Sequence, residues 1–255
     1  MEIEIKGYRC GLLGKWVEMV EDEFAKIINE DERISDFYVK NNSDKTPITI
    51  STQLRTMAQR IQSNIFDGHT GKVSRKYVND KIREAHYAEK ETIFTMRTHY
   101  WTENDKVYVK GCTLLIHLAP LSRDLCSFIY DLDTLWEMHK WLLHHEVGHF
   151  IDHILNGHNI SLQESDREYD RVQKDYANHY EWVRKYEKEP GYNCDTVNRA
   201  YYNIPSEARA NEYGGVDIDE MIRLSNKLDS YGENSVITLD ISVRKVVTKS
   251  ESKGE

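Results

Sequence analysis

Residues 134–157 read TLWEMHKWLLHHEVGHFIDHILNG. Apolar side chains recur along this stretch at the spacing of a helix that buries one face. Thr134 and Glu137 match a capping box at its start, and Gly157 suits a helix end. The pattern therefore predicts a helix over residues 134–156. The apolar positions are Leu135, Met138, Leu142, Val147, Ile151, Ile154 and Leu155.

Inside this helix, His145, Glu146 and His149 form the pattern H-E-x-x-H. With 11 His in 255 residues, chance would produce it about 0.08 times per chain. Residues four apart share one helical face, so both imidazoles can reach a single metal ion. The glutamate between them is offset to where a water on that ion would lie, and Zn²⁺ lowers the pKa of such a water to about 7. The pattern predicts a zinc site with Glu146 as general base.

The alternative without a metal is a histidine-rich helix in which the spacing is a coincidence. It is suggested by the fact that six of the 11 histidines fall between positions 139 and 158. Apolar neighbours on both sides argue against it, since buried imidazoles without a metal would need other partners. The remaining four histidines are expected at the surface or beside the ligands. They are His139, His144, His153 and His158.

A catalytic zinc site needs a third protein ligand and an open position. A metzincin pattern would require Gly and His where Asp152 and Leu155 stand, so it fails. His158 is one remaining candidate, although it lies just past the end of the helix. Glu207, in PSEARANEYG, is the other. Asn211 follows Glu207 by four residues and shares its helical face, where it could hydrogen-bond a ligand.

Residues 145–157 (HEVGHFIDHILNG), followed by residues 201–214 (YYNIPSEARANEYG), resemble the catalytic domain of the anthrax-lethal-factor-like and Mlc-titration-factor metallopeptidases. They are similar, more loosely, to the ImmA/IrrE-type peptidases. These families share H-E-x-x-H with a nearby Asp and Gly, and then an E-x-x-A helix that supplies the third ligand. The resemblance covers about residues 131–231. It implies a gluzincin-type zincin, that is, a zinc metalloendopeptidase.

The resemblance implies that His145, His149 and Glu207 bind the zinc and that Glu146 is the general base. Asp152 matches the family's aspartate and would have a structural or supporting role near the ligands.

A tyrosine seven residues before the third ligand stabilises the oxyanion in these families. Ala200 stands at that position here, so the role would pass to Tyr202 or, less well, to Tyr201. Asn211 replaces an acidic residue common in the lethal-factor group. Both are departures from the family pattern.

The remaining chain predicts an α+β protein, mostly helical, with a small β-sheet. Helices are expected over residues 14–30, 52–66 and 74–91, from about residue 164 to before Pro190, from Pro205 to Gly214, and from Asp217 onward. Strands are expected over residues 107–109 and 113–118, with Gly111 between them. The division expected is a helical region for substrate or partner recognition (1–100), a zincin-like metallopeptidase domain (101–235), and a strand-like segment with a frayed charged tail (236–255).

The composition sets further limits. The chain has 34 Lys+Arg against 43 Asp+Glu, a net charge of −9, so no nucleic-acid partner is expected. No run approaches the roughly 18 apolar residues that span a bilayer, and the N-terminus lacks a signal-peptide pattern. We therefore expect a cytoplasmic protein without a membrane partner. The four cysteines, at positions 10, 112, 126 and 194, form no C-x-x-C pair and are expected to be reduced and mostly buried.

These expectations combine into a zinc-dependent hydrolase that cleaves protein or peptide substrates by a metal-activated water. Residues 113–118 are expected to pair with an extended substrate by β-augmentation. One alternative is a metal-binding, non-hydrolytic interaction or regulatory protein on a zincin scaffold, against which the intact Glu146 argues. A second alternative is a helical scaffold without metal.

Overall fold

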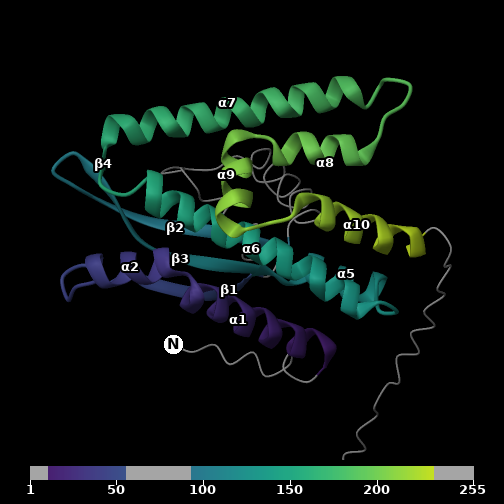
Figure 1. Ribbon diagram of the computed structural model, residues 1–255, viewed down its shortest axis with the longest axis horizontal. Helices are drawn as coiled ribbons and strands as arrows, with labels where there is room; N and C mark the ends of the chain where they lie inside the picture. The colour runs from purple at the N-terminus through teal and green to yellow at the C-terminus, as the bar shows by residue number, and fades with distance from the viewer. Residues whose placement is uncertain (1–10, 56–92, 233–255) are drawn as a thin grey trace, which may run out of the picture.

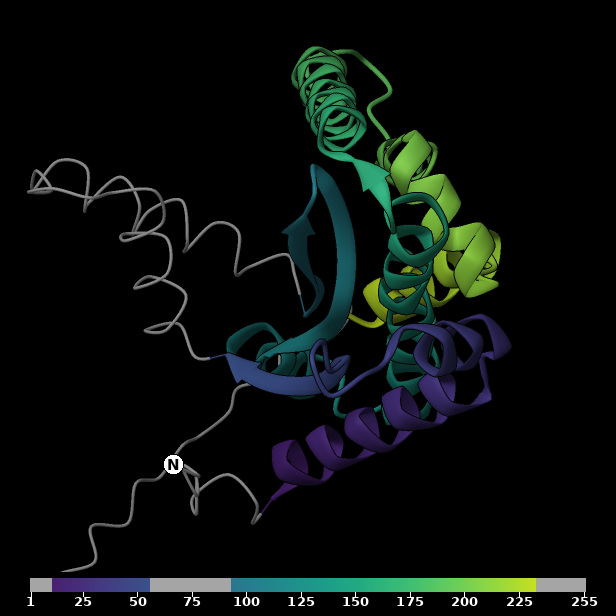
Figure 2. The same cartoon turned by 90° about the vertical axis from the view of Figure 1, so that its left-hand side faces the viewer.

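The computed structural model describes residues 11–55 and 93–232 (Figure 1). This part of the chain is an α+β arrangement in which one long helix lies against a small sheet. The helices are α1 (Leu12–Glu30), α2 (Glu32–Asn41), α5 (Leu118–Ser127), α6 (Leu132–Asn156), α7 (Leu162–Tyr186), α8 (Cys194–Tyr202), α9 (Pro205–Gly214) and α10 (Ile218–Gly232). Helix α6 lies over one face of the sheet, and α9 and α10 lie on the side of α6 away from the sheet (Figure 2).

The sheet has the order β1-β3-β2, and the two-residue β4 also pairs with β3. Its strands are β1 (Thr49–Arg55), β2 (Phe94–Glu103), β3 (Lys106–His117) and β4 (Ile160–Ser161). β1 runs parallel to β3, whereas β2 runs antiparallel to it. Residues 113–118 thus belong mainly to the central strand and have neighbours on both sides. The expectation that this segment pairs with substrate is wrong, because it has no free edge.

The predicted pair of strands around Gly111 is also wrong, because β3 is continuous through this glycine. Gly111 has a φ of 132°, and a Cβ there would lie 1.9 Å from the carbonyl oxygen of Thr49 in β1. The glycine therefore permits close approach of β1 and makes no turn. The hairpin turn lies earlier, at Asn104 and Asp105, whose φ values of 50° and 58° suit the tight turn that joins β2 to β3.

The helix predicted over residues 52–66 is wrong for residues 52–55, which belong to β1. The segment Thr49-Ile50-Ser51-Thr52 is rich in β-branched residues, and its pairing with β3 decides its conformation. The rest of that predicted helix, the charged helix predicted over residues 74–91, and the strand-like segment and tail after residue 235 lie outside the described residues.

One hydrophobic core joins the N-terminal helices to the rest of the described chain. Val20 of α1, Leu114 and Ile116 of β3, and Leu143 and Phe150 of α6 are fully buried within it. Strand β2 crosses residue 100, so the expected domain boundary there falls inside a strand. One face of α6 buries these apolar residues. The two histidines of its H-E-x-x-H pattern lie on another face, which α9 covers.

Helix ends follow local capping chemistry. α6 begins at Leu132, two residues earlier than predicted, because Asp131 accepts the Thr134 N–H at 3.2 Å. This cap replaces the predicted Thr134 and Glu137 box. α7 begins at Leu162, where Ser161 and Glu164 form a capping box.

The later helices agree better with the sequence. α9 spans the predicted residues and ends before Gly215, whose φ of 65° suits a glycine cap. α10 is capped as predicted, since Asp217 accepts the Glu220 N–H at 3.0 Å. The sequence pattern did not indicate α2, α5 or α8.

The cysteine prediction is partly wrong. Cys112, in central strand β3, is buried, whereas Cys126 and Cys194 are exposed at the ends of short helices. All three are free thiols. Within the described ranges, we find no helix with both the length and the apolar character needed to cross a membrane.

Candidate metal centre

Helices α6 and α9 touch backbone to backbone, and this contact builds the site. A Cβ on Gly148 of α6 would lie 1.9 Å from the Ala210 carbonyl oxygen of α9, and a Cβ on Gly214 would lie 2.2 Å from the His144 carbonyl oxygen. Only glycine fits at both crossings. Pro205 begins α9, so Glu207 lies in its first turn and faces α6.

The structure brings His145, His149 and Glu207 together. The Glu207 oxygens lie 3.0 Å from Nε2 of His145 and 3.6 Å from Nε2 of His149. One ligand atom from each residue lies within 4.8 Å of the other two. Ligand atoms about 2.1 Å from a tetrahedral ion are roughly 3.4 Å apart. The distances of 3.0 and 3.6 Å, which involve Oε2 and Oε1 of Glu207 respectively, are close to this value. Glu207 is only 1% exposed.

His145 is oriented toward Glu207 by Asn211. Its Nδ1 donates to Oδ1 of Asn211 at 2.7 Å, so Nε2 is the nitrogen that faces Glu207. Oε2 of Glu207 is buried without a hydrogen-bond partner, although Nε2 lies 3.0 Å away. A positive charge beside these two atoms would satisfy both. It can be a proton on Nε2, which makes an ion pair with Glu207, or a metal ion bound to both residues.

The negative charge of Glu207 also favours a bound cation. Burial raises the pKa of this carboxyl, but the adjacent imidazoles of His145 and His149 lower it more, so its pKa lies well below the ordinary range. Glu207 is therefore an ionised carboxylate at neutral pH and is available as an anionic ligand.

Glu146 points toward the sheet. Its carboxylate accepts the Met96 N–H of β2 at 2.5 Å. Burial raises the pKa of Glu146, and the neighbouring histidines offset this only in part. A carboxylate with a raised pKa is better suited to accept a proton than an ordinary one.

The two predicted supporting residues have different partners. Asn211 contacts His145, as its position four residues after Glu207 indicates. Asp152 does not hydrogen-bond the three site residues. It accepts two hydrogen bonds from Arg209 of α9, at 2.9 and 3.1 Å, and Arg209 also contacts Glu168 of α7. Asp152 therefore ties α6 to α9 and α7.

Both predicted tyrosines, Tyr202 and Tyr201, line the cavity beside His145 and Glu146. The Tyr202 ring packs edge-on against His145 at 5.7 Å, but its hydroxyl contacts the sulfur of Met221 at 3.9 Å. Burial, and to a smaller extent the negative charge of Glu207, raises the pKa of the Tyr202 hydroxyl to about 12. Tyr201 packs beside Tyr176 of α7. Tyr176 itself donates its hydroxyl to Oε1 of Glu207.

Sequence reasoning missed Tyr176 because it lies in the charged helix between the two motifs and matches neither. Its only sequence signal is its place among apolar residues three and four apart along α7, which marks the face turned toward the site.

His158 lies at a different place from the triad. Its Nδ1 accepts the Val109 N–H at 3.2 Å, and its ring meets Phe37 at 5.0 Å. His139 was expected at the periphery, but it is fully buried and accepts a hydrogen bond from Trp16 Nε1 at 3.0 Å. This bond satisfies Nδ1, whereas Nε2 is buried without a hydrogen bond and lies 3.7 Å from Oδ2 of Asp124.

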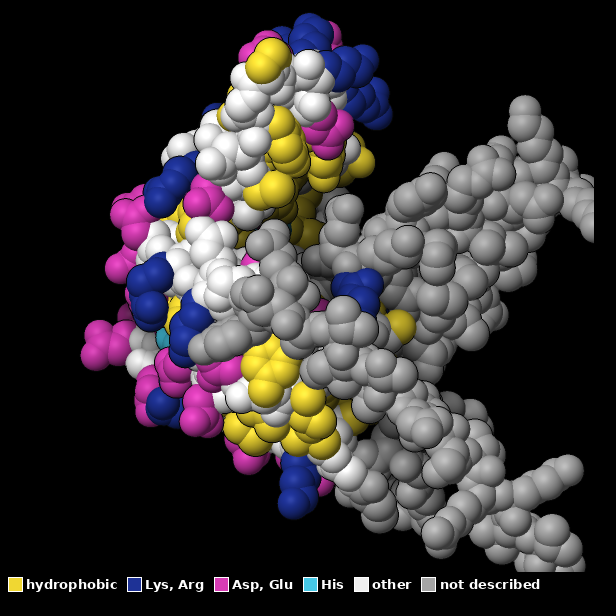
Figure 3. Space-filling view, turned by 90° about the vertical axis from the view of Figure 1, so that its right-hand side faces the viewer, with side chains coloured by type: hydrophobic (Ala, Val, Ile, Leu, Met, Phe, Trp, Pro, Cys, Tyr) yellow, Lys and Arg dark blue, Asp and Glu magenta, His cyan; other side chains and the backbone are white. Residues whose placement is uncertain are grey.

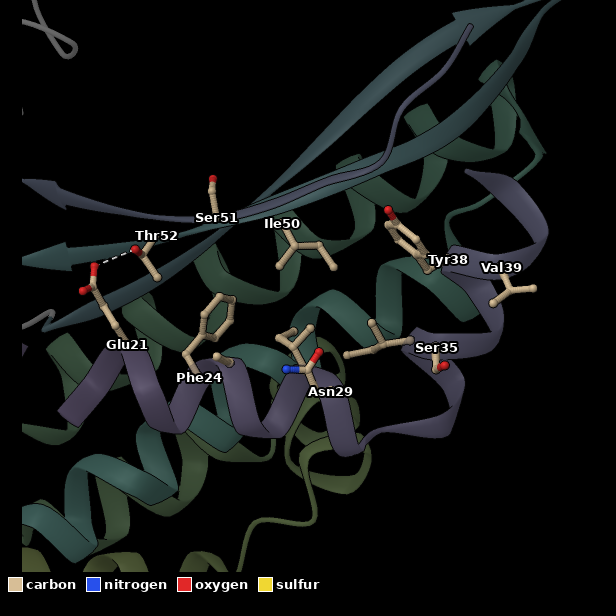
Figure 4. Close-up of a pocket in the computed structure, with 12 residues that line it drawn as sticks. Glu21, Phe24, Asn29, Ser35, Tyr38, Val39, Ile50, Ser51 and Thr52 are labelled. Atoms are coloured by element: carbon tan, nitrogen blue, oxygen red, sulfur yellow. Dashed lines mark hydrogen bonds between the residues drawn. The ribbon is translucent and has the colours of Figure 1, made fainter. Parts of the chain in front are cut away.

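A separate cavity of about 530 Å³ lies between α1, α2 and β1 (Figure 4). Phe24 and Ile50 give it apolar walls. Its one carboxylate, Glu21, already accepts the Thr52 hydroxyl at 2.7 Å.

Comparison with known proteins found no relative. No protein-family model matches the chain, and neither a curated protein nor a solved structure matches it.

Proposed function

We propose that the protein is a zinc metallopeptidase. His145, His149 and Glu207 bind the metal, and Glu146 is the general base. The observation that carries the proposal is that one possible ligand atom from each of His145, His149 and Glu207 lies within 4.8 Å of the other two.

The donor set favours zinc over Mg²⁺ and Ca²⁺. Two imidazoles and one carboxylate are a usual ligand set of catalytic zinc, whereas Mg²⁺ and Ca²⁺ prefer oxygen ligands alone. A bound zinc ion would lower the pKa of a water and polarise a substrate carbonyl.

The chain's own residues then supply proton transfer. Glu146, adjacent to His145 and held by the Met96 N–H, accepts a proton from the attacking water and passes it to the leaving amine. Tyr176 takes the place of Tyr202 and Tyr201 as the hydroxyl for the oxyanion in this proposal. Its hydroxyl lies beside the ligand Glu207 and would exchange the hydrogen bond to Oε1 of Glu207 for one to the oxyanion.

The substrate backbone pairs with β2 in this proposal. The Met96 N–H points toward α6 and away from β3, and among the described strands β2 pairs only with β3. An extended peptide could pair with this edge of β2 and pass beside Glu146.

The test combines metal analysis with peptide cleavage. Glu146→Gln should retain the wild-type zinc content and lose cleavage of a peptide library. Glu137→Gln, the same change at an exposed position of α6, is the matched control and should cleave normally. Equal cleavage by Glu146→Gln would refute the base assignment. A wild-type protein that binds zinc but cleaves no peptide would support the non-hydrolytic alternative.

A further inference from the structure

A polar cavity of about 280 Å³ lies between the end of α2, the connection from α2 to β1, and the strands of the β2–β3 hairpin. The connection and the hairpin lie at the same end of the molecule (Figure 1). His158, just after the end of α6, also lines this cavity. The cavity shares no lining residue with the two cavities that contain the metal ligands. A ligand bound here would therefore lie outside the candidate metal centre.

The charged side chains that line this cavity are both positive. They are Lys40 and Lys110, and no carboxylate among the described residues lines it, although the whole chain has a net charge of −9. The two signs are mixed elsewhere on the surface. On the face shown in Figure 3, magenta carboxylates lie among dark-blue Lys and Arg side chains. A cavity lined by one sign of charge attracts the opposite sign.

Both ammonium groups are available to a ligand. Lys110 forms no ion pair with another residue of the described ranges. Lys40 lies 3.6 Å from a carboxylate oxygen of Asp36, but these two side chains are 72% and 73% exposed. An exposed ion pair of this kind contributes little free energy, so a bound anion can compete with Asp36 for Lys40.

His158 adds a neutral hydrogen-bond donor. Its Nδ1 accepts the Val109 N–H at 3.2 Å, so the proton of the neutral ring is on Nε2. Burial lowers the pKa of His158, and the ring is therefore neutral at pH 7. Within the described part of the chain, Nε2 has no hydrogen-bond partner. The group that His158 can offer to a ligand is thus a donor.

Aromatic rings form another part of the lining. Trp101 of β2 and Tyr108 of β3 are cross-strand partners, and their ring centroids lie 5.0 Å apart. The Tyr108 ring also meets His158 edge-on at 5.6 Å. Trp101 and Tyr108 are both only half-buried and both line the cavity. Their open surface can pack against a planar ring in a ligand.

Size and charge restrict what the cavity can hold. Its volume is just below the range of about 300–1,000 Å³ that encloses drug-sized ligands, so one ring with a small substituent fits. A cationic ligand would be repelled by the two ammonium groups. A neutral ring would make no charge-assisted hydrogen bonds with them, whereas an anionic substituent would.

We propose that this cavity, here named the Trp101 pocket, binds a small aromatic molecule that carries a carboxylate or phosphate group. Lys40 and Lys110 bind the anionic group, and the ring packs beside Trp101 and Tyr108. The proposal depends neither on the metal centre nor on peptide cleavage.

The first experiment measures binding to the full chain by nuclear magnetic resonance. The anionic probes are phenyl phosphate and benzoate. Benzylamine is the cationic probe, benzyl alcohol is the neutral one, and inorganic phosphate lacks the ring. The indole N–H signal of Trp101 is assigned by its loss in Trp101→Phe, and affinities are taken from its shift. At least one anionic probe should bind about tenfold or more tightly than the other three molecules, and the tighter anionic probe identifies the preferred group.

The second experiment tests the lysines with the preferred probe at low salt, because salt screens exposed charges. Lys40→Gln and Lys110→Gln should each weaken binding about two- to fivefold, and the double variant should weaken it further. Lys15→Gln, at an exposed position of α1, changes the net charge equally and should bind as the wild type does.

Three results would overturn the proposal. The first is that neither anionic probe shifts the Trp101 signal. The second is that benzylamine, benzyl alcohol or inorganic phosphate binds as tightly as the anionic rings. The third is that the double lysine variant binds the preferred probe as tightly as Lys15→Gln does.

Discussion

Replacing Gly148 by alanine should push α9 away from α6 and weaken metal binding. The new Cβ would lie 1.9 Å from the Ala210 carbonyl oxygen, whereas ordinary contact begins at 3.4 Å. The helices must therefore separate by about 1.5 Å, the difference between these distances. Metal–ligand distances tolerate only about 0.2 Å. Because Glu207 lies on α9 and the histidines on α6, the ligand set opens.

The expected loss of zinc affinity is about 10–100-fold or more, the range seen when residues that orient ligands are removed. The fold should survive. Overpacking costs about 1–3 kcal/mol, and alanine recovers up to about 1 kcal/mol of helix propensity. A net loss of at most about 3 kcal/mol lowers the melting temperature by roughly 12 °C or less for a chain of this size.

Zinc affinity is measured by competition with a coloured chelator, and folding by circular dichroism. Gly11→Ala is the control, because a Cβ there meets no atom within 4 Å. A folded Gly148→Ala protein that binds zinc as tightly as the wild type would refute the reasoning.

Three further predictions follow from single contacts. Asn211→Leu removes the hydrogen-bond partner of His145 Nδ1 and should weaken zinc binding about 10–100-fold in the same competition assay. An unchanged zinc affinity would refute the role of Asn211 in orienting His145. Tyr176→Phe should lower kcat and leave KM nearly unchanged, whereas Tyr202→Phe should have little effect on kcat; the reverse order would restore the original tyrosine assignment. Asp131→Ala should cost about 1 kcal/mol of stability at neutral pH through loss of the α6 cap. Contact with Lys227 holds the pKa of Asp131 below its usual value of 3.8, so the stabilisation is present above that pH and disappears as pH falls. A melting-temperature difference from wild type that persists in acid would contradict this cap.

The local part of the site could be read from the sequence. His145 and His149 lie one turn apart on a helix whose apolar periodicity is strong, so their shared face needs no tertiary information. Glu207 and Asn211 also share a face, and motif matching related them to the histidines. The spacing between the two motifs left His158 open as a less favoured third ligand.

Non-local contacts account for most of the failures. The parallel pairing of β1 with β3 made a strand of residues that a local pattern assigned to a helix. Gly111 was read as a turn because its close neighbour, Thr49, is 62 residues away in sequence. Tyr176 contacts Glu207 because α7 packs near α9. The sequence of neither helix alone predicts this packing.

The most direct test is the zinc content of purified protein by elemental analysis, for the wild type, Glu207→Gln and the exposed α9 control Glu212→Gln. We expect one zinc per chain in the wild type and the control, and far less in Glu207→Gln. A wild-type protein that takes up no zinc, or a Glu207→Gln protein that retains it fully, would contradict a metal centre formed by α6 and α9.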